Sequence, residues 1–220
     1  MHRRDFIKKV ILFSLSFVIL KTKIMANSLF KPFNLVDGVF VNNYVSHKSS
    51  FKDFWKWRRE SSKPEPIAFP MVKNDPEYLK SNKSENTITW IGHSTFLLQI
   101  DGINILTDPH FTKRASPLSF MGPSRTTPPG LKIEELPFID FVLISHNHYD
   151  HLDSKTIQLL LKKQNVNRPT FFVPLKLKEI ISKLGARNVL EHEWWQMTQF
   201  KNLEIHSVPV QHWSKRTFND

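Results

Sequence analysis

Residues 145–153, with the sequence SHNHYDHLD, gather four side chains of the kinds that bind metals. His146, His148, Asp150 and His151 all fall within this segment. Imidazole nitrogens suit zinc, and a carboxylate adds charge and an oxygen ligand. His146 and His148 are two positions apart and can reach one metal, whereas Asp150 and His151 are displaced along the chain and can serve a second. A polar surface loop that holds histidines by chance is the ordinary alternative, which this density of ligands disfavours.

The flanking residues predict how this segment is held. Residues 140–144 are apolar and β-branched, which predicts a buried strand. The residues after Asp153 predict a helix that Asp153 caps. A rigid strand end can direct several short side chains at one point. We therefore expect a metal-binding loop between a strand and a helix.

This pattern resembles the metal-binding motif of the metallo-β-lactamase-fold hydrolases. Shorter motifs around it are similar to those of the branch that contains the N-acyl-phosphatidylethanolamine-hydrolysing phospholipases D. The resemblance covers about residues 88–220. It rests on the following motifs in this order: TWIGHST (89–95), LTDP (106–109), RASP (114–117), MGP (121–123), ELP (135–137), IDFVLISHNHYDHLD (139–153) and QHW (211–213).

The resemblance implies a fold, a cofactor and a reaction. The fold is a mixed α/β (α+β) αββα four-layer sandwich, and the cofactor is Zn²⁺, with two ions in an intact relative. The reaction cleaves N-acyl-phosphatidylethanolamine to phosphatidic acid and an N-acylethanolamine. It implies that His212 completes a three-histidine site with His146 and His148. Asp150 would be both ligand and catalytic group, and Asp108 would hold a ligand histidine in place.

Three further residues are candidates for lining the substrate site. His93 lies in the GHS motif, and a structural histidine between strands is an equal alternative. Met121 lies in the long loop 111–137, where it either contacts an acyl chain or packs on the core. Trp213 follows His212 and is a candidate for holding an anionic substrate.

The residues after His151 do not supply a full second site. The only later aspartates are Asp153 and Asp220, and no histidine follows His212. The family pattern needs a bridging aspartate and one more histidine from its C-terminal half. We therefore expect a chain truncated at its C-terminus that supplies mainly the N-terminal half of the sandwich, with one sheet face left wet. On this reading the chain is inactive alone, and a second chain carrying the missing half is a candidate partner.

Two alternatives remain beside a phospholipase of this kind. One is another hydrolase of the same fold, such as a lactonase, which the RASP and MGP motifs disfavour. The other is an inactive truncated remnant, which the missing ligands favour.

The chain divides into three predicted segments. Residues 1–26 resemble a twin-arginine signal peptide, with RRDFIK at residues 3–8 and an apolar run over residues 10–20. That run is shorter than the ~20 residues that a spanning helix needs, although an uncleaved membrane anchor is an alternative. Either reading predicts an exported, periplasmic or membrane-associated protein. Residues 27–86 form a lead-in segment, and residues 87–220 form a partial metallo-β-lactamase-fold domain.

Composition narrows the chemistry and the partners. The 220 residues include no cysteine, so neither a disulfide nor a thiolate ligand is possible and a metal must use histidine and carboxylate. The formal net charge is +11, and the basic residues are scattered along the chain. Such a charge favours anionic partners. We expect a phospholipid substrate and a membrane surface, and no nucleic acid.

Apolar patterns and turn residues predict the remaining elements. A helix follows Ser50, and the prolines from Pro64 to Pro76 mark an irregular linker. The turn Asp101-Gly102 predicts a hairpin. The other predicted elements are strands at 88–91, 95–100, 103–107, 170–173, 189–191 and 203–210, and a helix at 175–184 closed by Gly185.

Overall fold

The computed structural model describes residues 35–42, 50–62, 70–164, 169–210, 212–213 and 216. The predicted signal segment 1–26 therefore lies outside the described residues. Within the described ranges, no helix has the length and apolar character needed to span a membrane. The chain divides into two compact units, residues 1–61 and residues 62–220, and each is described by itself.

In the first unit, residues 35–42 and 50–61 are described, and they form a short hairpin and a helix. The hairpin joins β1 (Leu35–Val36) to β2 (Val39–Phe40), and its turn was not predicted from the sequence. The helix α2 (Phe51–Glu60) begins at the predicted cap. The Asp53 backbone N–H donates to Ser50 Oγ over 3.2 Å, and the Ser50 N–H donates to Asp53 Oδ2 over 2.8 Å. This reciprocal pair satisfies two donors that the helix start would otherwise leave free.

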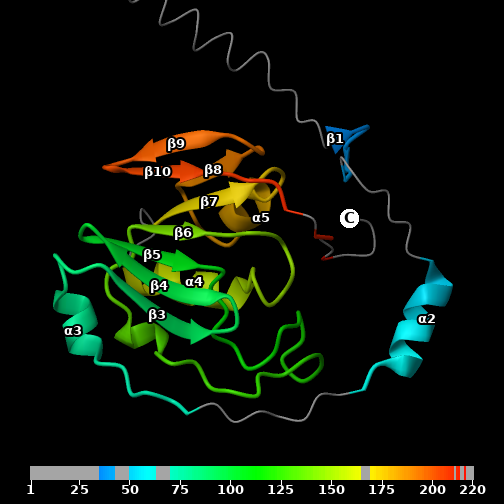
Figure 1. Ribbon diagram of the computed structural model, residues 1–220, viewed down its shortest axis with the longest axis horizontal. Helices are drawn as coiled ribbons and strands as arrows, with labels where there is room; N and C mark the ends of the chain where they lie inside the picture. The colour runs from blue at the N-terminus through cyan, green and yellow to red at the C-terminus, as the bar shows by residue number, and fades with distance from the viewer. Residues whose placement is uncertain are drawn as a thin grey trace, which may run out of the picture. The chain divides into compact units, whose positions relative to one another are not determined.

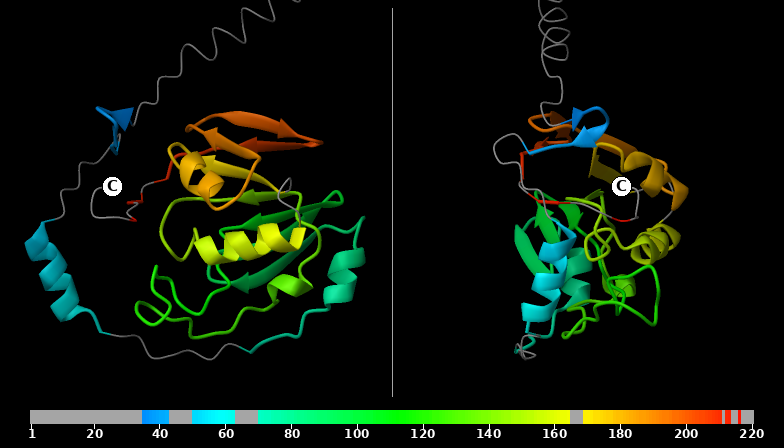
Figure 2. Two further views of the ribbon diagram at one scale, coloured as in Figure 1. Left: turned by 180° about the vertical axis from the view of Figure 1, so that it is seen from behind. Right: turned by 90° about the vertical axis from the view of Figure 1, so that its right-hand side faces the viewer.

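The second unit is built on a six-stranded mixed sheet (Figure 1). Its spatial order follows the chain: β3 (Thr87–Gly92), β4 (Thr95–Ile100), β5 (Ile103–Thr107), β6 (Phe141–Leu143), β7 (Thr170–Pro174) and β8 (Val189–His192). The first three strands pair antiparallel, and β5 to β8 pair parallel. The helices α4 (Ser154–Gln164) and α5 (Lys178–Lys183) connect the parallel strands and lie on one face of the sheet (Figure 2).

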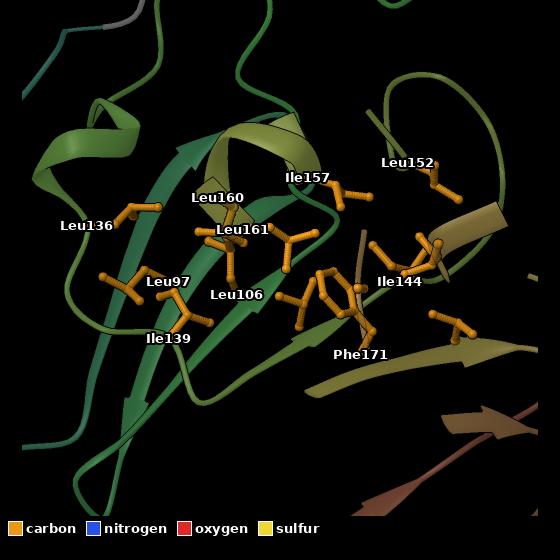
Figure 3. Close-up of a cluster of buried hydrophobic side chains, with 14 of the residues drawn as sticks. Leu97, Leu106, Leu136, Ile139, Ile144, Leu152, Ile157, Leu160, Leu161 and Phe171 are labelled. Atoms are coloured by element: carbon orange, nitrogen blue, oxygen red, sulfur yellow. The ribbon is translucent and has the colours of Figure 1, made fainter. Parts of the chain in front are cut away.

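Alternation along the strands divides the core into two clusters. Leu106, Val142 and Phe171 face the helices and join the larger cluster, which Figure 3 shows between α4 and the sheet. Ile105, Phe141 and Phe172 are their neighbours in sequence and point to the opposite face. Successive strand residues point to opposite faces, so a strand that is apolar throughout must be covered on both.

A second hairpin covers part of the face that was expected to stay wet. It consists of β9 (Met197–Phe200) and β10 (Leu203–His206), and its Phe200, Leu203 and Ile205 pack on the second cluster. The rings of Phe141 and Phe200 lie 4.9 Å apart in an edge-to-face contact. The strand predicted at 203–210 is wrong beyond His206. Ser207 still exchanges backbone hydrogen bonds with Gln196 and Trp195, but Trp195 has a φ of 68°, so the extended partner segment ends there.

The predicted linker contains a helix, α3 (Pro76–Ser81). Pro76 occupies the first helical position, where a missing N–H costs nothing. Asp75 caps the helix by accepting hydrogen bonds from the N–H groups of Glu77 and Tyr78. Leu79 is only 3% exposed and belongs to the larger cluster, so the core already includes residues that precede position 87.

The helix predicted at 175–184 is shorter than expected. It covers only Lys178–Lys183. Lys176 has a φ of 69°, which an α-helix does not tolerate, so the preceding residues form a turn instead.

The burial of the core can be tested by making the same Ile→Val substitution at a buried and at an exposed position. Ile157 on α4 is fully buried, whereas Ile88 on β3 is 74% exposed. We expect Ile157→Val to lower the free energy of unfolding by about 0.5–1.5 kcal/mol, because it removes a buried methyl group. Ile88→Val should change it by no more than about 0.5 kcal/mol. Urea denaturation followed by circular dichroism measures both, and equal losses would contradict the assigned burial.

His192 on β8 predicts a pH dependence. Its ring is buried against Phe172, and its Nε2 lies 2.9 Å from Thr198 Oγ1. Burial lowers the pKa of His192 below the ordinary 6.5. The unfolded chain then binds this proton more readily than the folded chain, so the stability falls as the pH drops below about 6.5. In His192→Gln, the loss of unfolding free energy between about pH 8 and about pH 5 should be smaller than in the wild type. Urea titrations at both pH values check this, and an unchanged difference would refute it.

Candidate metal centre

The metal-type side chains lie where two neighbouring parallel strands end. Asp108 follows β5, and the segment 145–153 follows β6. The two strands pair with Thr107 opposite Leu143, and the Asp108 N–H donates to the Leu143 carbonyl oxygen over 2.8 Å. The carboxyl ends of parallel strands share one edge of a sheet, where ligand sites commonly form. The predicted loop between a strand and a helix capped by Asp153 is confirmed.

Asp108 organises this loop through both of its carboxylate oxygens. Oδ1 accepts the backbone N–H of Ser145 over 2.7 Å, and Oδ2 accepts the Ser145 hydroxyl over 2.7 Å. Oδ2 also lies 2.9 Å from His151 Nδ1. The residue is 7% exposed and has a φ of 35°, a region that Asp enters more easily than most residues. The structure thus places Asp108 in contact with His151, in the supporting position that the sequence indicated.

Three histidines form the first ligand group. His146, His148 and His212 each bring one ring nitrogen within 4.8 Å of the others. His146 Nε2 lies 2.9 Å from His148 Nδ1, and the centre of the His212 ring lies 4.6 Å from that of His146. This is the set that the sequence analysis expected to bind one metal. Trp213, a candidate lining residue, has its ring centre 4.5 Å from that of His148.

The hydrogen bonds behind this group determine which ring nitrogens carry a hydrogen. Ser145 Oγ donates to Asp108 and lies 2.9 Å from His146 Nδ1, so His146 Nδ1 carries the hydrogen and Nε2 the lone pair. The hydrogen between His146 Nε2 and His148 Nδ1 would have to leave for a metal to bind there. Imidazole nitrogens without thiolates suit zinc and other borderline divalent cations. The donor set therefore fits a bound metal ion.

Burial and neighbouring charges favour the neutral form of two of these histidines, His146 and His148. Burial, followed by the neighbouring His151, His148 and His212, lowers the pKa of His146 to about 4. Burial and His212 also lower the pKa of His148. Histidine binds metals only in its neutral form. At neutral pH both rings are therefore ready to act as ligands.

The second ligand group contains a residue that the sequence placed only as a lining candidate. His93, Asp150 and His151 each bring one ligand atom within 4.8 Å of the others. His93 Nε2 lies 3.0 Å from Asp150 Oδ2 and 3.4 Å from His151 Nε2. His93 reaches this position from the turn between β3 and β4, with a φ of 52°. The geometry thus adds a third donor where the sequence indicated only Asp150 and His151.

Opposing effects shift the pKa values of His151 and Asp150. Burial lowers the pKa of His151, but the hydrogen bond and charge of Asp108 outweigh it, and the net shift is upward. Burial raises the pKa of Asp150, but its own backbone and the nearby His151 and His93 lower it overall. Asp108 holds the Nδ1 hydrogen of His151, which leaves Nε2 as the available donor.

Met121 is 58% exposed on the loop 111–137, so it does not pack in the core, and its contact with an acyl chain stays a prediction. Arg216 makes a contact that the sequence analysis did not predict, because its guanidinium binds the loop 145–153 and the residue after it. Nη1 donates to the carbonyl oxygens of Asn147 (2.9 Å) and Leu152 (2.8 Å), and Nη2 donates to Ser154 Oγ over 2.8 Å. Nothing in the local sequence around Arg216 signals this role.

Comparison with protein families decides the classification. The model described as "Beta-lactamase superfamily domain" matches residues 103–220, which is more than half of the chain. The chain belongs to the beta-lactamase superfamily. This match confirms the expected fold. In this chain the fold consists of a mixed sheet whose candidate metal centre lies at the carboxyl ends of the parallel strands.

Several curated proteins are similar in sequence to part of this chain, and two of them are named for an activity. An uncharacterized protein of Mycobacterium tuberculosis is 38% identical over 83% of this chain and 50% of its own length. N-acyl-phosphatidylethanolamine-hydrolyzing phospholipase D 1 of Caenorhabditis elegans is 38% identical over 60% of this chain and 39% of its own. A metal-dependent hydrolase of Methanopyrus kandleri is 28% identical over 58% of this chain and 48% of its own. The chain thus spans about half the length, or less, of the curated relatives it matches.

Proposed function

We propose that this chain carries the metal centre of a zinc-dependent hydrolase of phospholipase D type, which cleaves N-acyl-phosphatidylethanolamine to phosphatidic acid and an N-acylethanolamine. The observation that carries the proposal is the pair of three-residue ligand groups, which share the loop after β6 and are completed by His93 and His212 from elsewhere in the chain. Two adjacent metals suit hydrolysis of a phosphodiester. The similarity to a relative named for this reaction supports the choice of substrate.

The residues of the chain divide the work at such a site. His146, His148 and His212 would hold one zinc ion, and His93, Asp150 and His151 would hold a second. Bound zinc supplies positive charge that stabilises phosphoryl oxygens and lowers the pKa of water. Asp108 orients His151, and through Ser145 it fixes the hydrogen on His146. Asp150, whose Oδ2 lies 3.0 Å from His93 Nε2, would be a ligand of that group and the carboxylate that accepts a proton of the attacking water.

The setting of the enzyme is part of the same proposal. We propose that the protein is exported and acts at a membrane surface, because its substrate is a lipid and its net charge is +11. We also propose that a second chain supplies the remaining residues of the sandwich and further ligands. The exposed apolar residues Ile88 and Leu190 on opposite edge strands of the sheet are consistent with that arrangement.

The test uses the affinity-tagged protein, expressed in its own organism and purified together with any chain that binds it. This purified complex is the assembly. The assembly is incubated with vesicles that contain N-palmitoyl-phosphatidylethanolamine, and products are identified by mass spectrometry. We expect palmitoylethanolamide and phosphatidic acid in equal amounts, and loss of both after chelation or in His148→Ala. Hydrolysis of a lactone in place of the lipid would favour the alternative hydrolase. A metal-loaded assembly that cleaves neither substrate would refute the proposal.

A further inference from the structure

A cavity of about 310 Å³ opens beside the second ligand group. His93 and Asp150 of that group form part of its wall. Arg125 and His110, from the segment between β5 and β6, form another part. The volume lies at the small end of ligand sites, enough for a head group but not for acyl chains. A substrate atom in this cavity would therefore lie next to candidate metal ligands.

Arg125 is fixed by hydrogen bonds to backbone carbonyl groups, and within the described residues the Asp153 carboxylate acts on it only from beyond ion-pair distance. Nη1 donates to the His110 carbonyl oxygen over 2.7 Å, and Nε donates to the Thr127 carbonyl oxygen over 3.3 Å. Across the described ranges, no carboxylate oxygen lies within 4.0 Å of its guanidinium, and Nη2 makes no hydrogen bond. A guanidinium held by two carbonyl groups keeps its direction and retains free donors for an anion.

The backbone beneath Arg125 is shaped to admit its guanidinium. Gly92 lies on the same cavity wall, with a φ of 142°. A Cβ atom at Gly92 would collide with Arg125 Nη2. The guanidinium thus occupies space that is open because residue 92 is a glycine. Gly92 directly precedes His93 in the sequence. This close approach places Nη2 beside the turn that carries a candidate metal ligand.

His110 adds a second polar group to the wall. The side chain is 3% exposed, and its Nδ1 lies 3.3 Å from Arg125 Nη1. An arginine can only donate, so His110 Nδ1 accepts and Nε2 carries the hydrogen. Within the described part of the chain, no acceptor meets hydrogen-bond geometry at this Nε2, although the Arg114 backbone interacts with the His110 ring. His110 therefore adds a polar group to the wall but no donor that is plainly without a partner.

We propose that this cavity binds the anionic phosphate group of the substrate, with Arg125 as its cationic contact. The inference deepens the proposed function, since a phosphodiester held by Arg125 would present its phosphorus to the adjacent ligand groups. A guanidinium matches two phosphate oxygens at once, which a single ammonium does not. The shared chemistry is a phosphate oxyanion, from either a lipid head group or free phosphate.

The test measures binding, without turnover, to the full metal-free chain by isothermal titration calorimetry. The probes are dimethyl phosphate, inorganic phosphate and neutral trimethyl phosphate. We expect dimethyl phosphate to bind and trimethyl phosphate not to bind. Arg125→Gln should weaken dimethyl phosphate binding about 10- to 100-fold. Tighter binding of inorganic phosphate than of dimethyl phosphate, with the same dependence on Arg125, would keep the subsite and assign it to free phosphate.

Arg114→Gln is the matched control, because Arg114 lies in the same loop and donates to the Gly122 carbonyl oxygen instead of facing the cavity. It should change the affinity less than about 2-fold. Arg125→Lys keeps the charge and tests the fork geometry if Arg125→Gln does not fold. A wild-type chain that ignores dimethyl phosphate, or an Arg125→Gln chain that binds it equally, overturns the subsite.

The two proposals fail separately. Binding that depends on Arg125, in an assembly that never hydrolyses N-acyl-phosphatidylethanolamine, would refute the proposed function and leave the subsite intact. Hydrolysis in the assembly with an unchanged KM in Arg125→Gln would refute the subsite and leave the function intact.

Discussion

Replacing Asp108 with alanine is expected to lower the free energy of unfolding of the metal-free chain by about 2–4 kcal/mol and to weaken zinc binding about 10- to 100-fold. Its two oxygens accept from the Ser145 backbone, the Ser145 hydroxyl and His151. Without them, buried donors lose their partners and His151 loses its orientation. Urea denaturation gives the stability, and competition with a chromophoric chelator gives the zinc affinity.

Asp140→Ala separates the two effects. Asp140 is also largely buried, and it accepts the Asn104 N–H over 2.9 Å and pairs with Lys201 over 2.7 Å, away from the ligand groups. It should cost stability by a similar mechanism but leave zinc affinity unchanged. Asp108→Asn keeps the tolerance for a positive φ and should recover part of the stability. Equal zinc affinities for Asp108→Ala and the wild type would remove Asp108 from the metal centre.

Arg216→Ala should weaken zinc binding at the three-histidine group about 10- to 100-fold. The Arg216 guanidinium donates to two carbonyl oxygens of the metal loop and to Ser154 Oγ, and it stacks 4.1 Å from the Tyr149 ring centre. These bonds tie the segment that carries His212 to the loop that carries His146 and His148. Without them, His212 is no longer held at the distance that a shared metal requires.

Two milder variants test whether the tie itself matters. Arg216→Lys keeps the charge but cannot reach three acceptors in a fork, so it should recover little of the affinity. Tyr149→Phe removes only the 3.0 Å bond from the tyrosine hydroxyl to the Arg216 carbonyl oxygen and should cost less. Full zinc affinity in Arg216→Ala would show that His212 is positioned by other contacts.

Local patterns predicted the parts of the fold that depend on local physics. The strand and helix around the metal loop follow from an apolar run and an Asp cap, and both are present. The turn at Asp101-Gly102 is confirmed, with a positive φ at both residues, as a tight hairpin requires. The grouping of His146 and His148 follows from their two-residue spacing, because such a short segment keeps the two side chains close together.

The misses depend on contacts between distant residues. His93 joins Asp150 only because β3 and β4 bring their turn to the same edge as the loop after β6. Arg216 is 62 residues from Ser154 in the chain, and no local pattern relates the two. The helix α3 was missed for a different reason, since Pro76 was read as a linker residue although it is acceptable at a helix start.

The order of the sheet also determines when the metal centre can form during folding. Strands β3, β4 and β5 are joined by short turns and can pair early, because little chain entropy opposes local contacts. Pairing of β6 with β5 must wait until residues 108–140 have closed a long loop, and only this pairing brings Asp108 to Ser145. The ligand groups therefore form late on the folding pathway. Zinc should act mainly by slowing the unfolding rate, with little effect on the folding rate.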